Sequence, residues 1–206
     1  MPIVSSATRT LARASRSALC LLAFATLPAL ADDAPSRVRV NTNQGSFVIQ
    51  LESTRAPLSS ANFLTYVKSG YYVGTIFHRV ISNFVIQAGG YDEKQQVKVT
   101  QASIPNESGN GLSNKRGTVG LARSEAPHSG NAQFYVNVTD NDDLDPTPLR
   151  WGYAVFGRVV EGMDIVDKIS HVPTGSAGPW SRDAPLDAVV ITGVELQSGA
   201  AAAAAH

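Results

Sequence analysis

The fold of this chain is decided by one stretch, GTIFHRVISNFVIQAGG, residues 74–90. Its β-branched and aromatic residues predict two buried strands that are joined by a turn at Ser82-Asn83. The stretch carries Arg79 but contains no carboxylate that would neutralise it. Because burying an unpaired guanidinium is costly, Arg79 either extends to solvent or faces a group that needs a permanently charged, planar donor.

The alternation of side chains along a strand divides this stretch into two faces. One face of the first strand is expected to hold Phe77, Arg79 and Ile81, and the other Ile76, His78 and Val80. In the second strand Val85 and Gln87 share a face, with Phe84 at the corner. A guanidinium, a ring and an amide then surround one apolar surface, although the local pattern alone favours an arginine that extends to solvent beside a solvated glutamine.

The first 31 residues predict a cleaved secretory signal peptide. Three arginines and no acidic residue precede an apolar run, Leu19–Leu30, and residues 29–31 form an A-x-A cleavage site. A transmembrane helix is the alternative, but a bilayer span needs about 20 apolar residues, and this shorter run contains Pro28. Cleavage after Ala31 predicts a periplasmic or secreted protein with no membrane attachment.

Removal of the signal leaves a cysteine-free, mildly acidic chain. The single cysteine, Cys20, departs with the signal, which excludes disulfides, thiolate catalysis and cysteine-ligated zinc. Lipidation of Cys20 is disfavoured because Leu19 precedes it where a small residue is expected. Three of the 17 basic residues also depart, so 14 basic residues stand against 17 acidic ones, a net charge of −3. Without a basic cluster, the chain is not expected to bind nucleic acid.

The rest of the chain predicts many short strands and two helices in a single domain, residues 32–197. The predicted strands and helices are a hairpin at 37–51, a helix at 57–68, strands at 118–122, 133–138 and 153–159, a helix at 161–170 and a closing strand at 188–196. A long irregular segment, 89–116, is expected to be functional. The low-complexity tail, 198–206, is expected to be disordered. This order favours a mainly β barrel or sandwich with helical plugs.

Two later segments change the interpretation of residues 74–90. They are NGLSNKRGTVGLARSEAPHSGNAQFYVNV, residues 110–138, and NDDLDPTPLRWGYAVFGRVVEGMDIVDKI, residues 141–169. Together with FHRVI and FVIQAGG, their order and spacing resemble the cyclophilin-type peptidyl-prolyl isomerases, and among these the secreted bacterial branch. The resemblance extends from about Val38 to Leu196. It implies a closed, eight-stranded antiparallel β-barrel that is capped by two α-helices.

The resemblance also implies a site for a proline-containing peptide. Arg79 matches the catalytic arginine of the family. The matched substrate-binding residues are Phe84, Val85 and Gln87 at the floor and edge, Ala122 and Arg123 at a strand end, Gln133 and Phe134 as a neighbouring amide and ring, Leu144 as an apolar wall, and Tyr153 at a position where many members have histidine.

Asp143 is the main departure from the family pattern. It lies where the family has an aromatic residue, which is tryptophan in cyclosporin-sensitive members. A carboxylate cannot supply the indole donor or the apolar contact. Strong cyclosporin binding is therefore not expected.

The implied reaction explains why an unpaired arginine would be present. Rotation about an amide bond meets a barrier of about 18–20 kcal/mol because the nitrogen lone pair is delocalised. No bond is broken, so no nucleophile, metal or cofactor is needed, and a catalyst has only to favour the twisted state. In that state the prolyl nitrogen accepts a hydrogen bond, and arginine is a donor that never loses its proton.

Other sites are less well supported by the sequence. The histidines lack metal-ligand spacing, and His78 is expected to pack on the face opposite Arg79. A calcium loop at the aspartates of residues 140–145 lacks the glycine and the distal glutamate, so a solvated acidic loop is favoured.

The sequence thus predicts a monomeric isomerase that acts on X-Pro bonds of unfolded or folding secreted and envelope proteins. The alternative is a non-catalytic proline-peptide-binding module, or a holdase chaperone, on the same fold.

Overall fold

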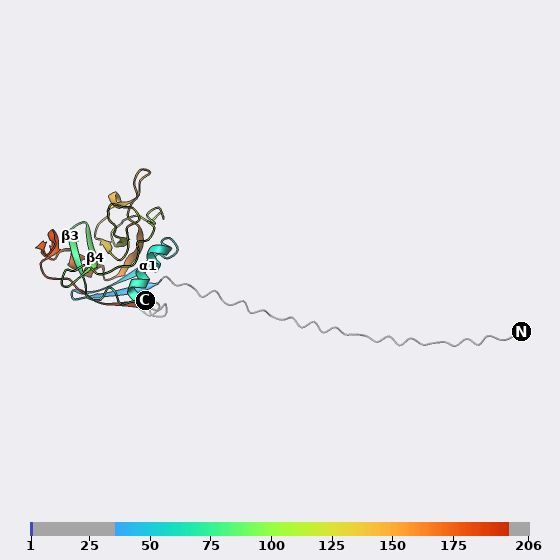
Figure 1. Cartoon of the computed structure of the whole chain (residues 1–206), viewed down its shortest axis with the longest axis horizontal. Coiled ribbons are helices and arrows are strands. Elements are labelled where there is room, and N and C mark those ends of the chain that lie inside the picture. The colour runs from blue at the N-terminus through green and yellow to red at the C-terminus, as the bar shows by residue number, and fades with distance from the viewer. Residues whose placement is uncertain (2–35, 198–206) are drawn as a thin grey trace. The chain divides into compact units, whose positions relative to one another are not determined.

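Eight antiparallel strands form the main sheet of this computed structural model, which describes Met1 and residues 36–197. The predicted signal peptide, apart from Met1, and the C-terminal tail lie outside the described residues. The sheet order is β10-β1-β2-β7-β5-β6-β4-β3, and Figure 1 shows the last two strands, β4 and β3, side by side. Its strands are β1 (Arg37–Thr42), β2 (Gly45–Leu51), β3 (Thr75–Ile81), β4 (Val85–Asp92), β5 (Thr118–Leu121), β6 (Phe134–Asn137), β7 (Val155–Glu161) and β10 (Ile191–Gln197).

The sheet curls strongly, so that its two end strands approach each other. Between β3 and the residues just before β10 the structure has an isolated bridge, Ile76 to Val190, and backbone hydrogen bonds such as Phe77 N to Val189 O at 2.9 Å. No continuous ladder joins these two strands among the described residues. The fold is therefore mainly β with two helices, as predicted, whereas the fully closed barrel is not confirmed.

The first helix, α1, spans Pro57–Lys68 as predicted. Pro57 occupies a first-turn position, where a missing N–H costs nothing. The carboxylate of Glu107, from the long irregular segment, accepts hydrogen bonds from the backbone N–H groups of Leu58 and Ser59 at 3.0 and 2.7 Å. These bonds satisfy free donors at the positive end of the helix and attach the segment to it.

The second helix, α2, spans Met163–Ser170 and begins two residues later than predicted. Gly162 precedes it with φ 75°, and a Cβ at this position would collide with the backbone of Ser46. A left-handed glycine therefore turns the chain from β7 into α2, and the helix cannot start earlier. Among the described helices, none is long and apolar enough to span a membrane.

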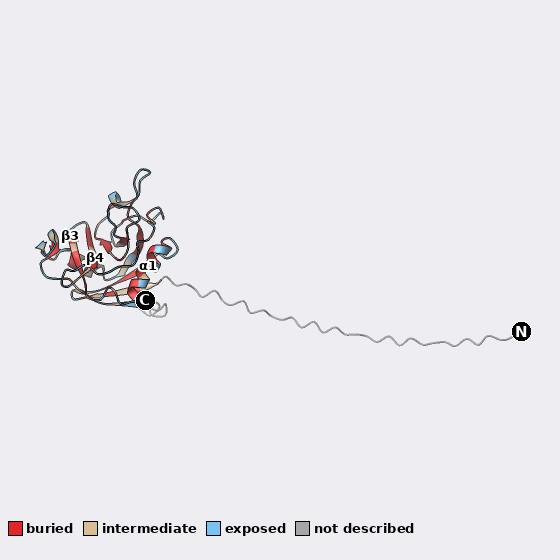
Figure 2. Ribbon diagram, in the orientation of Figure 1, coloured by how far each residue is buried: buried red, intermediate tan, exposed pale blue. Residues whose placement is uncertain are grey.

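The hydrophobic core lies between α1, α2 and the inner face of the sheet, and the buried residues follow the strands in Figure 2. Phe63 on α1 packs against Tyr72, Phe134 and Phe156, with ring centroids 5.2 to 5.5 Å apart. These rings lie on the inner side of the sheet, and the solvent-facing side of β4 and β6 lies opposite them. The core thus supports the strands that carry the predicted site.

The strand β3 departs from the predicted alternation of faces. Its pairing with β4 shifts between Phe77 and Arg79, where a bulge interrupts the ladder. As a result Phe77 and Val80 both join the core, while Arg79 remains half-buried outside it. The prediction that Phe77 and Arg79 share a face is wrong, because a bulge changes the facing of the residues that follow it.

A small hairpin that the sequence did not predict covers the outer side of β3. It consists of β8 (Thr174–Ala177) and β9 (Trp180–Pro185). His78 lies beneath it, 5% exposed, with its ring 5.5 Å from Trp180 and 4.7 Å from Tyr91. His78 is thus a packed residue, as predicted, and its Nδ1 has no hydrogen-bond partner among the described residues.

Candidate active site

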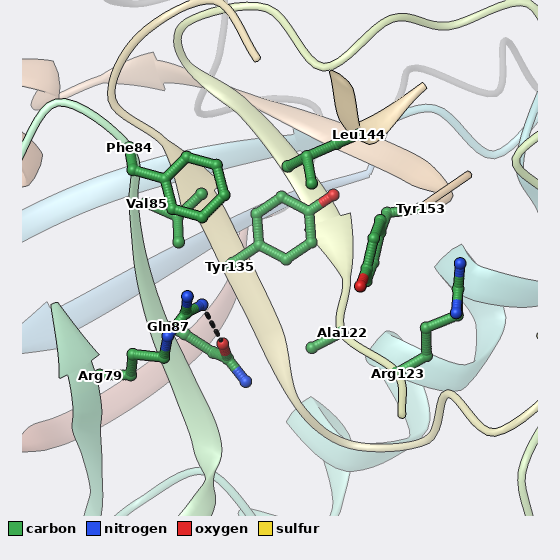
Figure 3. A pocket seen from close by; sticks show the side chains of 9 residues that line it. All are labelled: Arg79, Phe84, Val85, Gln87, Ala122, Arg123, Tyr135, Leu144 and Tyr153. Carbon is green, nitrogen blue, oxygen red and sulfur yellow. Dashed lines mark hydrogen bonds between the residues drawn. The ribbon is translucent and has the colours of Figure 1, made fainter. Parts of the chain in front are cut away.

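A pocket of about 160 Å³ lies on the outer side of β4, β5 and β6 (Figure 3). It is smaller than the roughly 300 Å³ at the lower end for small-molecule sites, so it suits a single small ring. Most of the predicted site residues line it. The lining residues are Arg79, Phe84, Val85, Gln87, Ala122, Arg123, Tyr135, Leu144 and Tyr153.

Arg79 lies at one edge of the pocket and is oriented by an amide. Its Nη1 donates to Gln87 Oε1 at 3.2 Å, and its guanidinium carbon lies 5.7 Å from the centre of the Phe84 ring. Among the described residues, no carboxylate lies within salt-bridge distance of Arg79. The guanidinium therefore has no counter-ion among the described residues and keeps several N–H donors free beside an apolar surface.

Gln87 belongs to a short relay of amides. Its Nε2 donates to Gln133 Oε1 at 2.9 Å, while its Oε1 accepts from Arg79. Gln133 does not line the main pocket. It lines a neighbouring hollow of about 300 Å³ that shares Gln87, Ala122 and Arg123 with the main pocket. The relay therefore restrains Arg79 from the side of this second hollow.

The structure corrects the predicted role of Phe134. Phe134 is 1% exposed, and its ring packs edge-on against Phe63 and Tyr72 in the core. The neighbouring Tyr135 lines the pocket instead, because side chains alternate along β6 and the residue next to Gln133 faces inward. In the sequence, the two-residue spacing of Gln133 and Tyr135 indicates this arrangement. It places an amide and a ring on one face.

Tyr135 forms the middle of the pocket, with Phe84 and Val85 to one side and Leu144 and Tyr153 to the other in Figure 3. Gly120 on β5 leaves room for it, since a Cβ there would collide with the Tyr135 ring. Burial is the main reason why the pKa of Tyr135 is raised well above its ordinary value, so the phenol stays neutral. The pocket floor is thus an uncharged aromatic surface.

The far wall of the pocket is held by Arg123. Its guanidinium carbon lies 4.4 Å from the centre of the Tyr153 ring. The same group donates to the backbone oxygens of Trp151 and Gly152, at 2.8 and 3.2 Å. Arg123 therefore fastens the segment before Tyr153 to the end of β5, a contact that the sequence did not predict.

The acidic residues between 140 and 145 do not line the pocket. Asp143 is exposed and does not line the pocket. Among the acidic residues nearby, Asp140 and Asp142 pair with Lys115 at 3.5 and 2.6 Å. Within the part of the chain that the structure describes, no group of three or more His, Cys, Asp and Glu residues could hold a metal ion.

The fold and the site together correspond to one enzyme class. The chain matches the family described as "Cyclophilin type peptidyl-prolyl cis-trans isomerase/CLD" over residues 37–196. This match extends from β1 to β10 and contains every residue that lines the pocket. The chain belongs to the cyclophilin-type peptidyl-prolyl cis-trans isomerases.

Relatives that are named as peptidyl-prolyl cis-trans isomerases support the same assignment. Peptidyl-prolyl cis-trans isomerase cyp18 of Streptomyces antibioticus is 51% identical, over 78% of this chain and 98% of that protein. Peptidyl-prolyl cis-trans isomerase B of Escherichia coli is 48% identical, over 77% and 98%. A peptidyl-prolyl cis-trans isomerase of Acinetobacter baylyi is 47% identical, over 80% and 87%. The predicted enzyme class is confirmed.

Solved structures agree at the level of the fold. A cyclophilin-type isomerase of Cryptosporidium parvum, determined in the presence of the dipeptide Ala-Pro, has a TM-score of 0.65 and 25% identity. The comparison covers 79% of this chain and 99% of that one. The cyclophilin fold expected from the resemblance is therefore confirmed.

Proposed function

We propose that this isomerase binds proline-containing segments of folding secreted or envelope proteins, and that Arg79 donates a hydrogen bond to the prolyl nitrogen in the twisted state. Spontaneous X-Pro isomerisation takes tens to hundreds of seconds, which is slow enough to limit folding. The observation that carries the proposal is the free, charged guanidinium of Arg79 beside an apolar pocket of about 160 Å³.

The pocket walls would hold the prolyl ring. Phe84, Tyr135 and Leu144 offer apolar surface on three sides. A ring held there presents its nitrogen toward Arg79, which lies at the edge of the same pocket. A donor that acts where water is excluded, and is already oriented, stabilises the twisted state more than either planar state.

The preceding peptide would bind along the neighbouring hollow. Ala122 already donates its backbone N–H to Gln133 O at 2.9 Å. Among the described residues, the backbone N–H and C=O of Arg123 have no such partner, so they remain open to an extended peptide. Holding one side of the X-Pro bond there leaves the other side free to rotate.

The test of the Arg79 mechanism is a proline-peptide isomerisation assay on residues 32–206. Replacing Arg79 by Ala should lower kcat/KM by about 10²–10³, the loss seen on removing one oxyanion-hole donor. Arg182→Ala is the matched control, because Arg182 is exposed on β9 and lies outside the pocket. Full activity in Arg79→Ala would exclude the mechanism, and a wild-type chain that binds peptide without isomerising it would favour the non-catalytic module.

The location of the enzyme is a separate proposal, and it rests on the first 31 residues. The full chain, produced in a Gram-negative host, should appear in the periplasmic fraction with Asp32 as its first residue. A variant with Leu21→Arg and Leu22→Arg interrupts the apolar run and should stay unprocessed in the cytoplasm. An intact N-terminus on cytoplasmic wild-type protein would refute this proposal.

A further inference from the structure

A buried polar network lies directly behind the pocket, and it centres on Asn114. Asn114 is 0% exposed. Its side-chain oxygen accepts from Tyr135 Oη at 2.6 Å and from Asn137 Nδ2 at 3.2 Å. Its side-chain nitrogen donates to Asp145 Oδ1 at 2.8 Å and to Tyr153 O at 3.3 Å. An asparagine side chain offers two donors and two acceptor positions, so all four are used.

The network reaches a further wall of the pocket through Asn141. Asn141 Nδ2 donates to Asn137 Oδ1 at 2.7 Å and to Phe84 O at 3.0 Å. Its backbone N–H donates to Asn114 O at 2.8 Å. The network therefore connects Phe84, Tyr135 and Tyr153, three aromatic residues that come from separate segments of the chain.

Asp145 attaches the remaining wall. It follows Leu144 directly, and its carboxylate accepts from the Ser113 hydroxyl and from the backbone N–H of Asn114, the latter at 2.8 Å. Burial raises the pKa of Asp145, but the hydrogen bonds from Ser113 and Asn114 outweigh it, so the pKa is lowered and the carboxylate stays charged. Charge-assisted bonds of this kind are stronger than neutral ones. Leu144 is thus held by the same network as the aromatic walls.

The residues that this network joins are those that form the pocket walls, which a network that served stability alone would not require. Every aromatic or leucine side chain that lines the pocket is carried by a residue that the network binds or adjoins. Satisfied hydrogen bonds in a low-dielectric interior fix positions closely, whereas apolar packing alone allows small shifts. A displacement of 1 Å at a catalytic site can cost about 10² in rate.

We propose that Asn114 and Asp145 are positioning residues, which hold the pocket walls at the spacing that places a prolyl nitrogen opposite Arg79. This inference rests on the proposed function of Arg79. It adds that the activity depends on two side chains that do not themselves line the pocket.

The test compares isomerisation kinetics and thermal stability in three variants. Asn114→Ala and Asp145→Ala should each lower kcat/KM by about tenfold to a hundredfold, and mainly through kcat, because alignment with Arg79 matters most in the twisted state. Thr75→Val is the matched control. Thr75 is also 0% exposed, and its hydroxyl donates to Tyr72 O at 2.7 Å, but it does not line the pocket. It should lose stability and keep its kcat.

Two further variants separate positioning from simple destabilisation. Asp145→Asn keeps an oxygen that can accept from Asn114, so it should restore most of the kcat that Asp145→Ala loses. The double variant Asn114→Ala/Asp145→Ala should be no slower than the worse single variant, because both changes break one network. If Asn114→Ala fails to fold, the kinetics of Asp145→Ala and Asp145→Asn test the proposal without it, because Asp145 is only half-buried.

The proposal is overturned if Asp145→Ala keeps a wild-type kcat well below its melting temperature, or if its loss is not rescued by Asp145→Asn. This failure differs from failure of the proposed function. An inactive Arg79→Ala with a fully active Asp145→Ala would remove only the positioning role. A fully active Arg79→Ala would instead remove the mechanism on which the positioning role depends.

Discussion

At the scale of single residues, the orientation of Arg79 depends on a hydrogen bond to a neutral acceptor, the side-chain oxygen of Gln87, at 3.2 Å. An arginine side chain has many rotamers, and ordering it costs up to about 2 kcal/mol. Gln87 reduces this cost because its amide is itself held by Gln133. A charged acceptor would orient Arg79 more strongly, but it would also occupy the donors that the prolyl nitrogen needs.

We therefore predict that Gln87→Ala lowers kcat/KM for a proline peptide by about tenfold, or about 1.4 kcal/mol. The guanidinium would remain charged but would no longer be held toward the pocket. Gln133→Ala is the matched comparison, since it leaves the bond between Arg79 and Gln87 in place and should have a smaller effect. Equal activities of wild type and Gln87→Ala would show that the amide does not orient the arginine.

Single residues also differ in how well their place in the site could be predicted from the sequence. Strand alternation correctly grouped Val85 with Gln87, because β4 pairs regularly there. The same rule places Tyr135 on the face of Gln133, whereas the family resemblance assigns the pocket ring to Phe134. The role of Arg123 in binding the backbone of residues 151 and 152 could not be predicted, since it depends on a contact between distant loops.

At the scale of elements, the sequence predicted the regular parts and missed the irregular ones. The bounds of α1 were predicted correctly because Pro57 marks its start and Gly70, with φ 69°, follows its end. The bulge in β3 was missed because it depends on the register with β4. The β8–β9 hairpin was missed because its strands, TGSA and WSRDAP, are short and lack alternation.

The hairpin has a predictable effect on stability, because it buries His78. Burial is the main cause that lowers the pKa of His78 to about 4 from 6.5; the nearby backbone of Ile76 opposes the shift, and the charge of Arg79 adds to it. Between pH 6.5 and about 4, the His78 side chain is therefore mostly protonated in the unfolded chain and mostly neutral in the folded chain. The contribution of neutral His78 to the free energy of unfolding is fully present above pH 6.5, and it is lost as the pH is lowered from 6.5 to about 4.

The expected loss over this range is about 3 kcal/mol. Urea unfolding at a series of pH values measures it directly. His78→Phe keeps a ring against Tyr91 and Trp180 but cannot be protonated, so it should lack the loss of stability that His78 causes. The lowered pKa values of Asp140, Asp145 and Asp167 reduce stability below about pH 5 in both proteins. The contribution of His78 is therefore the difference in the free energy of unfolding between wild type and His78→Phe at each pH. A wild type as insensitive to pH as His78→Phe would contradict this prediction.

At the scale of the whole molecule, the chain between residues 32 and 197 should be the complete folding unit. The first and last strands of this region pair with each other, from Arg37 opposite Gln197 to Thr42 opposite Ile191. Ile191 is 0% exposed and belongs to the core. The last strand is therefore needed to complete the core, whereas the low-complexity composition of residues 198–206 predicts that they add little to it.

This arrangement predicts opposite outcomes for two truncations. A chain of residues 32–197 should melt within about 2 °C of residues 32–206, a difference of less than 1 kcal/mol for a domain of this size. A chain of residues 32–190 lacks β10, leaves β1 without a partner on one side and exposes the core at Val38 and Val40. It should show no cooperative thermal transition by circular dichroism. If residues 32–190 melted cooperatively, β10 would be an accessory strand, and if residues 32–197 were strongly destabilised, the folding unit would extend into the tail.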